Sequence, residues 1–185
     1  MQNWIIWATL GAAAVFFIVL YNRIISLVQA RKNAFSDIDV QLKLRHDLIP
    51  NLIETVKGYA AHEKGVLENV TAARASAMRG GSISDRVQSE SALSAAMMQL
   101  MAVAENYPQL KADANFRQLQ SELSDIENKI AAARRFFNNA TNEYNTGIQQ
   151  FPSVLVARLF GYKEEVFFEL GAEAQAAQTP PKVSF

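Results

Sequence analysis

Polar and titratable side chains are concentrated in one stretch of the sequence, between Asp37 and Glu63. Asp47, Asn51 and Glu54 are separated by four and three residues, so they would share one face of a helix. Such a face could form a hydrated acidic groove that binds a cation or the basic side chain of a partner. A solvated outer face explains the same spacing, and we favour it. The stretch consists of Asp37, Asp39, Arg45, His46, Asp47, Asn51, Glu54, Lys57, His62 and Glu63.

A second polar cluster lies further along the chain, where guanidinium and amide side chains follow one another at spacings of three and four residues. Arg45 and Arg134 fall on or next to apolar stripes. We expect such arginines to pair with inward carboxylates such as Asp37 or Glu127 and to fix the register between helices, a role that we prefer to ligand binding. The cluster consists of Arg134, Arg135, Asn138, Asn139, Asn142, Glu143 and Asn145.

The patterns of known catalytic and metal sites are incomplete in this sequence. His62 and Glu63 begin like a zinc-protease helix motif, but Val66 stands where the second histidine is required. A di-iron bundle needs Glu-x-x-His pairs, whereas Lys43 and Tyr59 precede the two histidines by three residues. The glycine motifs of phosphate-binding loops and serine nucleophiles do not occur. We therefore assign no catalytic, cofactor-binding or metal-binding residue and expect a protein that is not an enzyme.

Composition narrows the classes of protein further. The 185 residues have a mass of 20.5 kDa, which is enough for one domain and an accessory segment. Lys and Arg together number 18, as do Asp and Glu, so we expect no basic surface for nucleic acid. The absence of cysteine excludes disulfides, thiolate metal sites and thiol nucleophiles.

An apolar run near the start of the chain, from Trp4 to Tyr21, predicts a membrane-spanning helix. The run carries no charge and, at ~1.5 Å per residue, reaches nearly across a hydrocarbon core of ~30 Å. Aromatic residues lie near both ends, at the level of the headgroups. A cleaved signal peptide is the alternative, but residues 1–3 are uncharged and no small-residue cleavage site follows. We therefore expect an uncleaved anchor that contacts the bilayer from Trp4 to Tyr21.

The basic residues around this anchor predict its orientation. Arg23, Arg31 and Lys32 follow the apolar run closely, whereas residues 1–3 carry no charged side chain. By the positive-inside rule, we expect the large C-terminal part of the chain to lie in the cytoplasm.

Beyond the anchor, apolar residues recur in heptads, which is typical of helices packed at shallow angles. Pro50 falls inside the first pattern, and we expect a kinked continuation of the helix there, because the apolar phase is kept. Gly80 and Gly81 mark a stop, and Ser84 with Asp85 can cap the next helix. The first pattern consists of Val28, Phe35, Leu42, Ile49 and Val56, with Ile38, Leu52 and Tyr59 between them.

Two later segments carry the same pattern. From Arg86 to Glu105 the chain is rich in Ala and Met, and the apolar face is Leu93, Met97, Leu100 and Ala104. The next segment carries one row of bulky side chains and one row of smaller side chains. A neighbouring helix can approach closely along the row of smaller side chains. The bulky row is Phe116, Leu123, Ile130, Phe137, Tyr144 and Phe151, and the other row is Leu119, Ile126, Ala133, Ala140 and Gly147. A shorter apolar piece follows, from Val154 to Phe160.

These patterns predict an all-α fold, with an N-terminal transmembrane helix followed by an antiparallel up-and-down bundle of about four long helices. The expected divisions are an anchor over residues 1–27, a bundle over residues 28–170 and a loosely held tail over residues 171–185. The rows of small residues could also be shared between two copies of the chain, which leaves a homo-oligomer open.

Two long segments, Asp39 to Ala77 and Glu127 to Glu169, closely resemble the LemA family. The layout is similar as well, with LIPNL after His46 and Asp47, AENYPQLKA from Ala104, and a PKVSF ending. The resemblance implies a bacterial, single-pass, membrane-anchored helical bundle whose biochemical role is not established and for which no catalytic residues can be carried over. Some relatives are associated with building magnetosome membranes, which keeps a membrane-organising role open.

The leading functional expectation is a non-enzymatic, membrane-anchored scaffold or interaction protein whose partners are other proteins. The alternative is a cation-dependent enzyme or sensor that uses the polar stretch from Asp37 to Glu63. A further hypothesis concerns the tail, because the segment from Pro180 to Phe185 suits capture by a sheet-edge groove of another protein.

Overall fold

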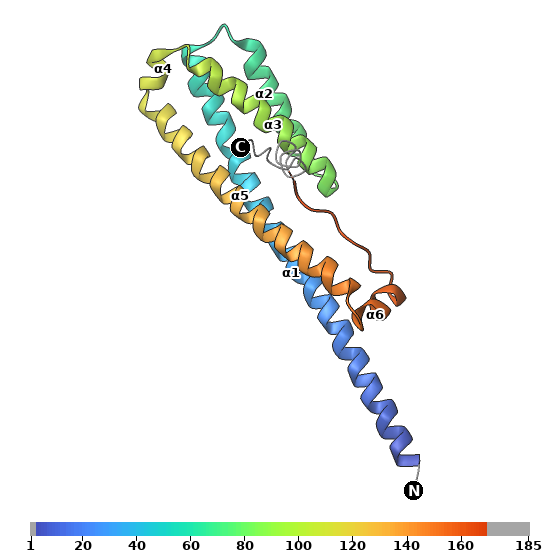
Figure 1. Ribbon diagram of the computed structural model, residues 1–185. Coiled ribbons are helices and arrows are strands. Elements are labelled where there is room, and N and C mark those ends of the chain that lie inside the picture. Colours follow the sequence, from blue (N-terminus) through green and yellow to red (C-terminus); the bar gives the residue numbers. More distant parts are fainter. Residues whose placement is uncertain (1–2, 170–185) are drawn as a thin grey trace, which may run out of the picture. The chain divides into compact units, whose positions relative to one another are not determined.

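The computed structural model describes residues 3–169, which form six α-helices and contain no β-strand. The all-α fold expected from the sequence is confirmed. The chain divides into two compact units, and the long helices α1 and α5 contribute to both. The helices are α1 (Asn3–Tyr59), α2 (Lys64–Ala77), α3 (Ile83–Ala104), α4 (Pro108–Ala112), α5 (Ala114–Gln149) and α6 (Ser153–Leu159) (Figure 1). Among the described residues, the first unit holds 3–37 and 135–167, and the second holds 38–134 with 168 and 169.

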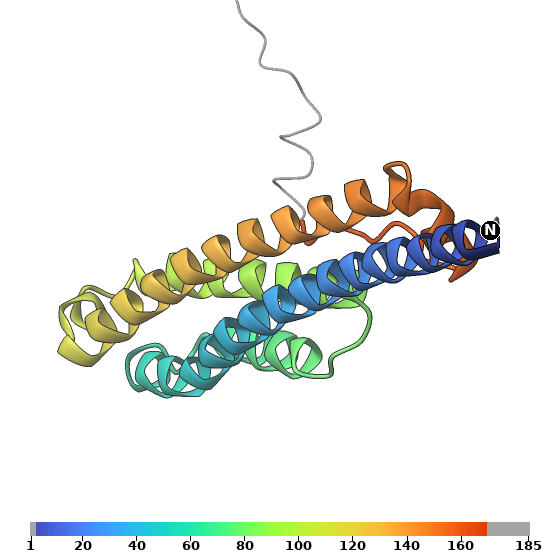
Figure 2. The ribbon, with the colours of Figure 1, turned by 90° about the horizontal axis from the view of Figure 1, so that it is seen from below.

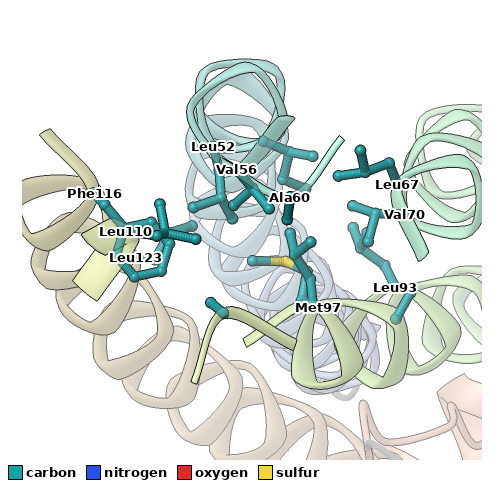
Figure 3. Close-up of a cluster of buried hydrophobic side chains, with 14 of the residues drawn as sticks. Leu52, Val56, Ala60, Leu67, Val70, Leu93, Met97, Leu110, Phe116 and Leu123 are labelled. Carbon is teal, nitrogen blue, oxygen red and sulfur yellow. The ribbon is translucent and has the colours of Figure 1, made fainter. Parts of the chain in front are cut away.

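The second unit is organised around an apolar core to which five helices contribute. The four residues predicted to form one face of α3 are all buried in it, and α2 lies beside α3 (Figures 1 and 2). Burial of a side chain of leucine size stabilises the fold by about 1.5–3 kcal/mol, so this cluster is the main source of the unit's stability. The labelled residues in Figure 3 are Leu52, Val56, Ala60, Leu67, Val70, Leu93, Met97, Leu110, Phe116 and Leu123.

The turn between α2 and α3 shows how local sequence ends one helix and begins another. Gly80 and Gly81 have φ angles of 71° and 131°, which L-amino acids with side chains rarely adopt. Ser82 then caps α3, because its Oγ accepts the Asp85 N–H at 3.2 Å while Asp85 Oδ2 accepts the Ser82 N–H at 3.0 Å. The expectation that Ser84 caps this helix was wrong, since Ser84 already lies within α3.

The first unit has a smaller apolar core made by the beginning of α1, the end of α5 and α6. Ile24, Tyr144 and Ile148 are buried there together with two residues of α6. Further along the same helices, the rings of Phe35 and Phe137 lie 5.5 Å apart, and both belong to the predicted heptad rows. The small row also matters, since a Cβ at Gly147 would lie 2.5 Å from Leu27 Cδ1. The expected close approach of a helix along this row is confirmed at Gly147.

Helix α1 contains the one segment, within residues 3–169, that is long and apolar enough to cross a membrane. Only 6% of its most apolar stretch of 18 residues is buried inside the structure. Large side chains such as Trp7, Val15 and Ile18 are therefore exposed. A helix with exposed apolar residues on all sides requires an apolar environment. The described structure therefore agrees with a membrane-spanning role for the run from Trp4 to Tyr21.

Several local expectations about helix continuity and burial can be compared with the structure. Helix α1 continues through Pro50, so the predicted continuation is confirmed, whereas the kink expected there stays a prediction. The chain leaves the helix after Tyr59. Tyr59 was expected in the apolar seam but is exposed, because it ends the helix and directs its hydroxyl to Asp113 Oδ2 at 3.0 Å. Phe151 was likewise expected on the buried row, yet it is 81% exposed because α5 ends at Gln149. The heptad spacing of apolar residues therefore continues in the sequence beyond the residue at which the helix ends.

The predicted divisions of the chain stay predictions. Helix α1 is continuous across the expected anchor boundary between residues 27 and 28, and α5 is shared by both compact units. The tail from residue 171 onward, with its proposed capture segment from Pro180 to Phe185, lies outside the described residues.

Candidate functional site: a buried charge network

A buried ionic network in the second unit is built around Arg45 of α1. Its Nη2 forms an ion pair with Oε2 of Glu90 on α3, and both side chains are almost completely enclosed. Its Nη1 donates to Glu127 Oε1 on α5 at 2.8 Å and to Ser94 Oγ at 3.2 Å. The predicted pair between Arg45 and Glu127 is confirmed. The other carboxylate proposed at the sequence level, Asp37, lies at the surface. One guanidinium thus joins three helices.

His46 completes the network from the next position on α1. Its Nε2 lies 2.9 Å from Oε1 of Glu90, so both carboxylate oxygens of Glu90 are engaged. Pro50 has no N–H to donate to the carbonyl of His46, four residues earlier. Arg74 of α2 provides the missing donor, with its Nε at 2.7 Å from that oxygen. The proline therefore creates an acceptor that fixes α2 against α1.

The surroundings of the carboxylates set their pKa values in opposite directions. Burial by itself raises the pKa of Glu90, but the hydrogen bond from His46 and the charge of Arg45 outweigh it and hold the pKa below its ordinary value. Burial raises the pKa of Asp39, although the ion pair with Arg86 of α3 opposes it. Glu90 is therefore a fixed anion near neutral pH, which makes it a weak proton acceptor.

A hollow of about 270 Å³ borders this network. It is smaller than the ~300–1,000 Å³ of sites that bind drug-sized ligands, so it suits water or a small solute. A histidine–carboxylate pair beside a cavity is half of a general acid–base site. The other half, a reactive group or bound substrate next to His46, would have to enter this hollow. Its lining is Asp39, Leu42, Lys43, His46, Ala77, Met78, Gly80, Arg86 and Glu90.

The polar stretch predicted between Asp37 and Glu63 divides between two sides of α1. Arg45, His46 and Asp39 lie on the side of the network. Asp47, Asn51 and Glu54 are exposed and share one face, as the favoured solvated arrangement requires. Within residues 3–169 no group of three or more His, Cys, Asp or Glu side chains is arranged to hold a metal ion. The cation-binding alternative stays a prediction. The other exposed members are Asp37, Lys57 and His62, while half-buried Glu63 accepts the Tyr107 hydroxyl at 3.1 Å.

The second polar cluster contributes to the packing of the first unit. Asn145 of α5 binds the backbone of Glu165 twice, donating to its carbonyl at 2.9 Å and accepting its N–H at 2.8 Å. Arg31 of α1 pairs with the Glu165 carboxylate at 3.1 Å, donates to Thr141 Oγ1 and lies over the Phe137 ring. These contacts hold the segment after α6 against α1 and α5. Of the cluster, Asn145 therefore has a structural role, and the expected pairing of Arg134 with a carboxylate stays a prediction.

Sequence reasoning missed four residues of the network, Glu90, Arg74, Arg86 and Ser94. For Glu90 a signal was present, because positions 90, 97 and 104 are seven residues apart and place Glu90 on the row of Met97 and Ala104. A carboxylate on a buried heptad row requires a cationic partner. No comparable signal marked Arg74, whose partner is a backbone carbonyl on another helix.

Fold and site together define an all-α protein in which residues 3–169 contain one candidate membrane span and inward charges join the helices. A family model for the LemA family matches residues 34–185. The chain therefore belongs to the LemA family, as the resemblance of its two long segments had indicated.

Curated relatives match most of the chain at low identity. The magnetosome protein MamQ of Magnetospirillum gryphiswaldense is 22% identical over 93% of this chain and 72% of its own length. The magnetosome proteins MamQ 1 and MamQ 2 of Paramagnetospirillum magneticum are each 23% identical over 86% of this chain and 67% of their own length. The similarity to these relatives therefore extends over most of the chain.

Proposed function

We propose that this protein is a non-enzymatic, single-pass membrane-anchored scaffold that presents a helical surface to a protein partner. The observation that carries the proposal is the continuity of α1, in which one helix contains the apolar run from Trp4 to Tyr21 and the residues Arg45 and His46 of the bundle network. Anchoring and presentation are thus functions of the same element.

The arrangement of the charged groups favours binding over catalysis. Both oxygens of Glu90 are occupied by Arg45 and His46, so neither is directed at a substrate. By contrast, α1 carries an exposed row on its outer side that is apolar at one end and polar at the other. The row consists of Val40, Leu44, Asp47, Asn51 and Glu54, at spacings of four and three residues. This row is the surface that we assign to the partner.

The cytoplasmic side is the orientation proposed for the bundle. Arg23 and Lys32 are exposed on α1 shortly after the apolar run, where the positive-inside rule counts basic residues most strongly. The partner would then be a cytosolic protein or the cytosolic part of another membrane protein.

Copurification from detergent-solubilised membranes tests the scaffold function. We expect the tagged full chain to recover a discrete partner in several mild detergents, and Leu44→Glu to abolish the recovery. Met98→Glu is the matched control, because Met98 is an exposed apolar residue on α3, outside the row. Recovery of the chain alone in every detergent would contradict a scaffold. Equal loss with both variants would contradict the assigned surface.

A second candidate function is the organisation of the membrane itself, and the likeness to proteins named for the magnetosome favours it. Reconstitution of the purified full chain into liposomes distinguishes the two functions. A membrane-organising protein would change vesicle size or shape in the absence of a partner, whereas a scaffold would leave the vesicles unchanged.

A further inference from the structure

Helix α6 carries large apolar side chains that the first unit leaves uncovered. Leu155 and Leu159 are four residues apart on one side of the helix and are 60% and 71% exposed. Phe151, just before the helix, is exposed as well. Exposed apolar residues at single positions are common, but neighbouring ones on one short helix mark a contact surface. We call Phe151, Leu155 and Leu159 the α6 face.

The opposite side of α6 fixes the helix to its own unit. Val156 and Ala157 are buried in the cluster with Ile24 of α1 and with Tyr144 and Ile148 of α5. Leu20 and Tyr21 pack against the same cluster. The α6 face is therefore held in a defined direction by a packed core.

Ring contacts place the end of α6 next to the candidate membrane span. The Phe160 ring lies 4.8 Å from that of Tyr21 and 6.2 Å from that of Phe17, measured between centroids. Phe17 is four residues inside the apolar run, which corresponds to about 6 Å along a helix. A side chain that contacts Phe17 must lie at the depth of the bilayer boundary when the run spans the membrane. Figures 1 and 2 show α6 beside this part of α1.

We propose that α6 is a second membrane contact, whose face of Phe151, Leu155 and Leu159 inserts into the lipid interface beside the anchor helix. Interfacial helices bury their apolar side about 5–10 Å deep at the boundary of headgroups and acyl chains. Arg158 of α6, with Lys163 after it and Arg23 of α1, is exposed in the same unit, where long basic side chains can reach lipid phosphates. The lipid surface, continuous with the span, is the occupant of the α6 face.

This inference rests on the membrane anchor of the proposed function, and one labelling experiment tests both separately. Single cysteines are introduced into the cysteine-free full chain as Leu155→Cys, Leu159→Cys, Val19→Cys and Met98→Cys. Each variant is labelled with bimane and reconstituted at a low protein-to-lipid ratio. Quenching is then measured with shallow nitroxide-labelled lipid and with aqueous iodide. Val19 is the control inside the apolar run, and Met98, 72% exposed on α3, matches the exposure of Leu159.

We expect the lipid nitroxide to quench labels at Leu155 and Leu159 as strongly as at Val19, with a loss of iodide quenching relative to Met98. Iodide quenching equal to that at Met98 would overturn the α6 contact while leaving the anchor intact. Protection from both quenchers would also overturn it, since a protein surface such as a second copy would then cover the face. Absence of lipid quenching at Val19 would overturn the anchor itself.

Discussion

Replacement of Glu90 by Gln tests the buried charge network most sharply. The substitution keeps the size of the side chain but removes the negative charge that Arg45 and His46 share. Arg45 is 0% exposed, so the remaining positive charge cannot turn towards water. Its other carboxylate partner, Glu127, is 46% exposed and compensates only in part. The variant therefore leaves a buried cation with incomplete pairing.

The magnitude follows from the burial of the two partners. Breaking a buried ion pair by removing one partner costs about 3–5 kcal/mol. Because the amide of Gln can still accept a hydrogen bond from Arg45, we expect a loss of about 3 kcal/mol in the free energy of unfolding. For a chain of this length each kcal/mol corresponds to about 2–4 °C, so Tm should fall by about 6–12 °C. Glu127→Gln, at a half-exposed pair, should cost less than about 1 kcal/mol.

The assay is thermal unfolding of the full chain in detergent, followed by far-UV circular dichroism. Arg45→Met combined with Glu90→Leu is the second comparison, because replacing a whole buried pair by apolar residues is often neutral. The double variant should therefore be more stable than Glu90→Gln alone. Equal losses for Glu90→Gln and Glu127→Gln, or a change below about 0.5 kcal/mol for Glu90→Gln, would refute the reasoning.

Three further outcomes are expected. The folded-state pKa of Glu90 is lowered, so its contribution to stability is present above its ordinary pKa and is lost as the pH falls below that pKa. In this acidic range, urea unfolding should show a steeper loss of stability for the natural chain than for Glu90→Gln. Arg74→Met leaves the His46 carbonyl without its donor and should cost about 1–3 kcal/mol in the same titration, whereas Arg79→Met, at an exposed site, should be nearly neutral. Magnesium or calcium in excess should leave Tm unchanged, whereas a bound cation at a hundredfold excess over its Kd would add about 2.7 kcal/mol of stability.

The apolar seams were predictable because heptad spacing determines which side chains a long helix can bury. Leu93, Met97 and Leu100 lie in the core as their spacing required. The same spacing wrongly predicted that Phe151 is buried. Spacing carries no information about where a helix ends, and α5 ends at Gln149. Tyr59 shows the same limit at the end of α1.

The charge network was only half predictable. An arginine on an apolar stripe requires an anion, which identified Arg45 and one of its partners, Glu127. The choice of Glu90 as the second partner depends on the way α3 packs against α1, and the chain between them does not encode that register locally. Pro50 leaves the carbonyl of His46 without a helical donor, and the donor that it finds, Arg74, comes from another helix.

The measurement that tests the membrane-anchored scaffold most directly is the accessibility of single cysteines on the two sides of the apolar run. Asn3→Cys and Met98→Cys are labelled with a membrane-impermeant thiol reagent in right-side-out membrane vesicles. A single-pass anchor with a cytoplasmic bundle predicts labelling at position 3 and protection at position 98 until the vesicles are opened. Identical behaviour at both positions would contradict a single pass, and the reverse pattern would place the bundle outside the cytoplasm.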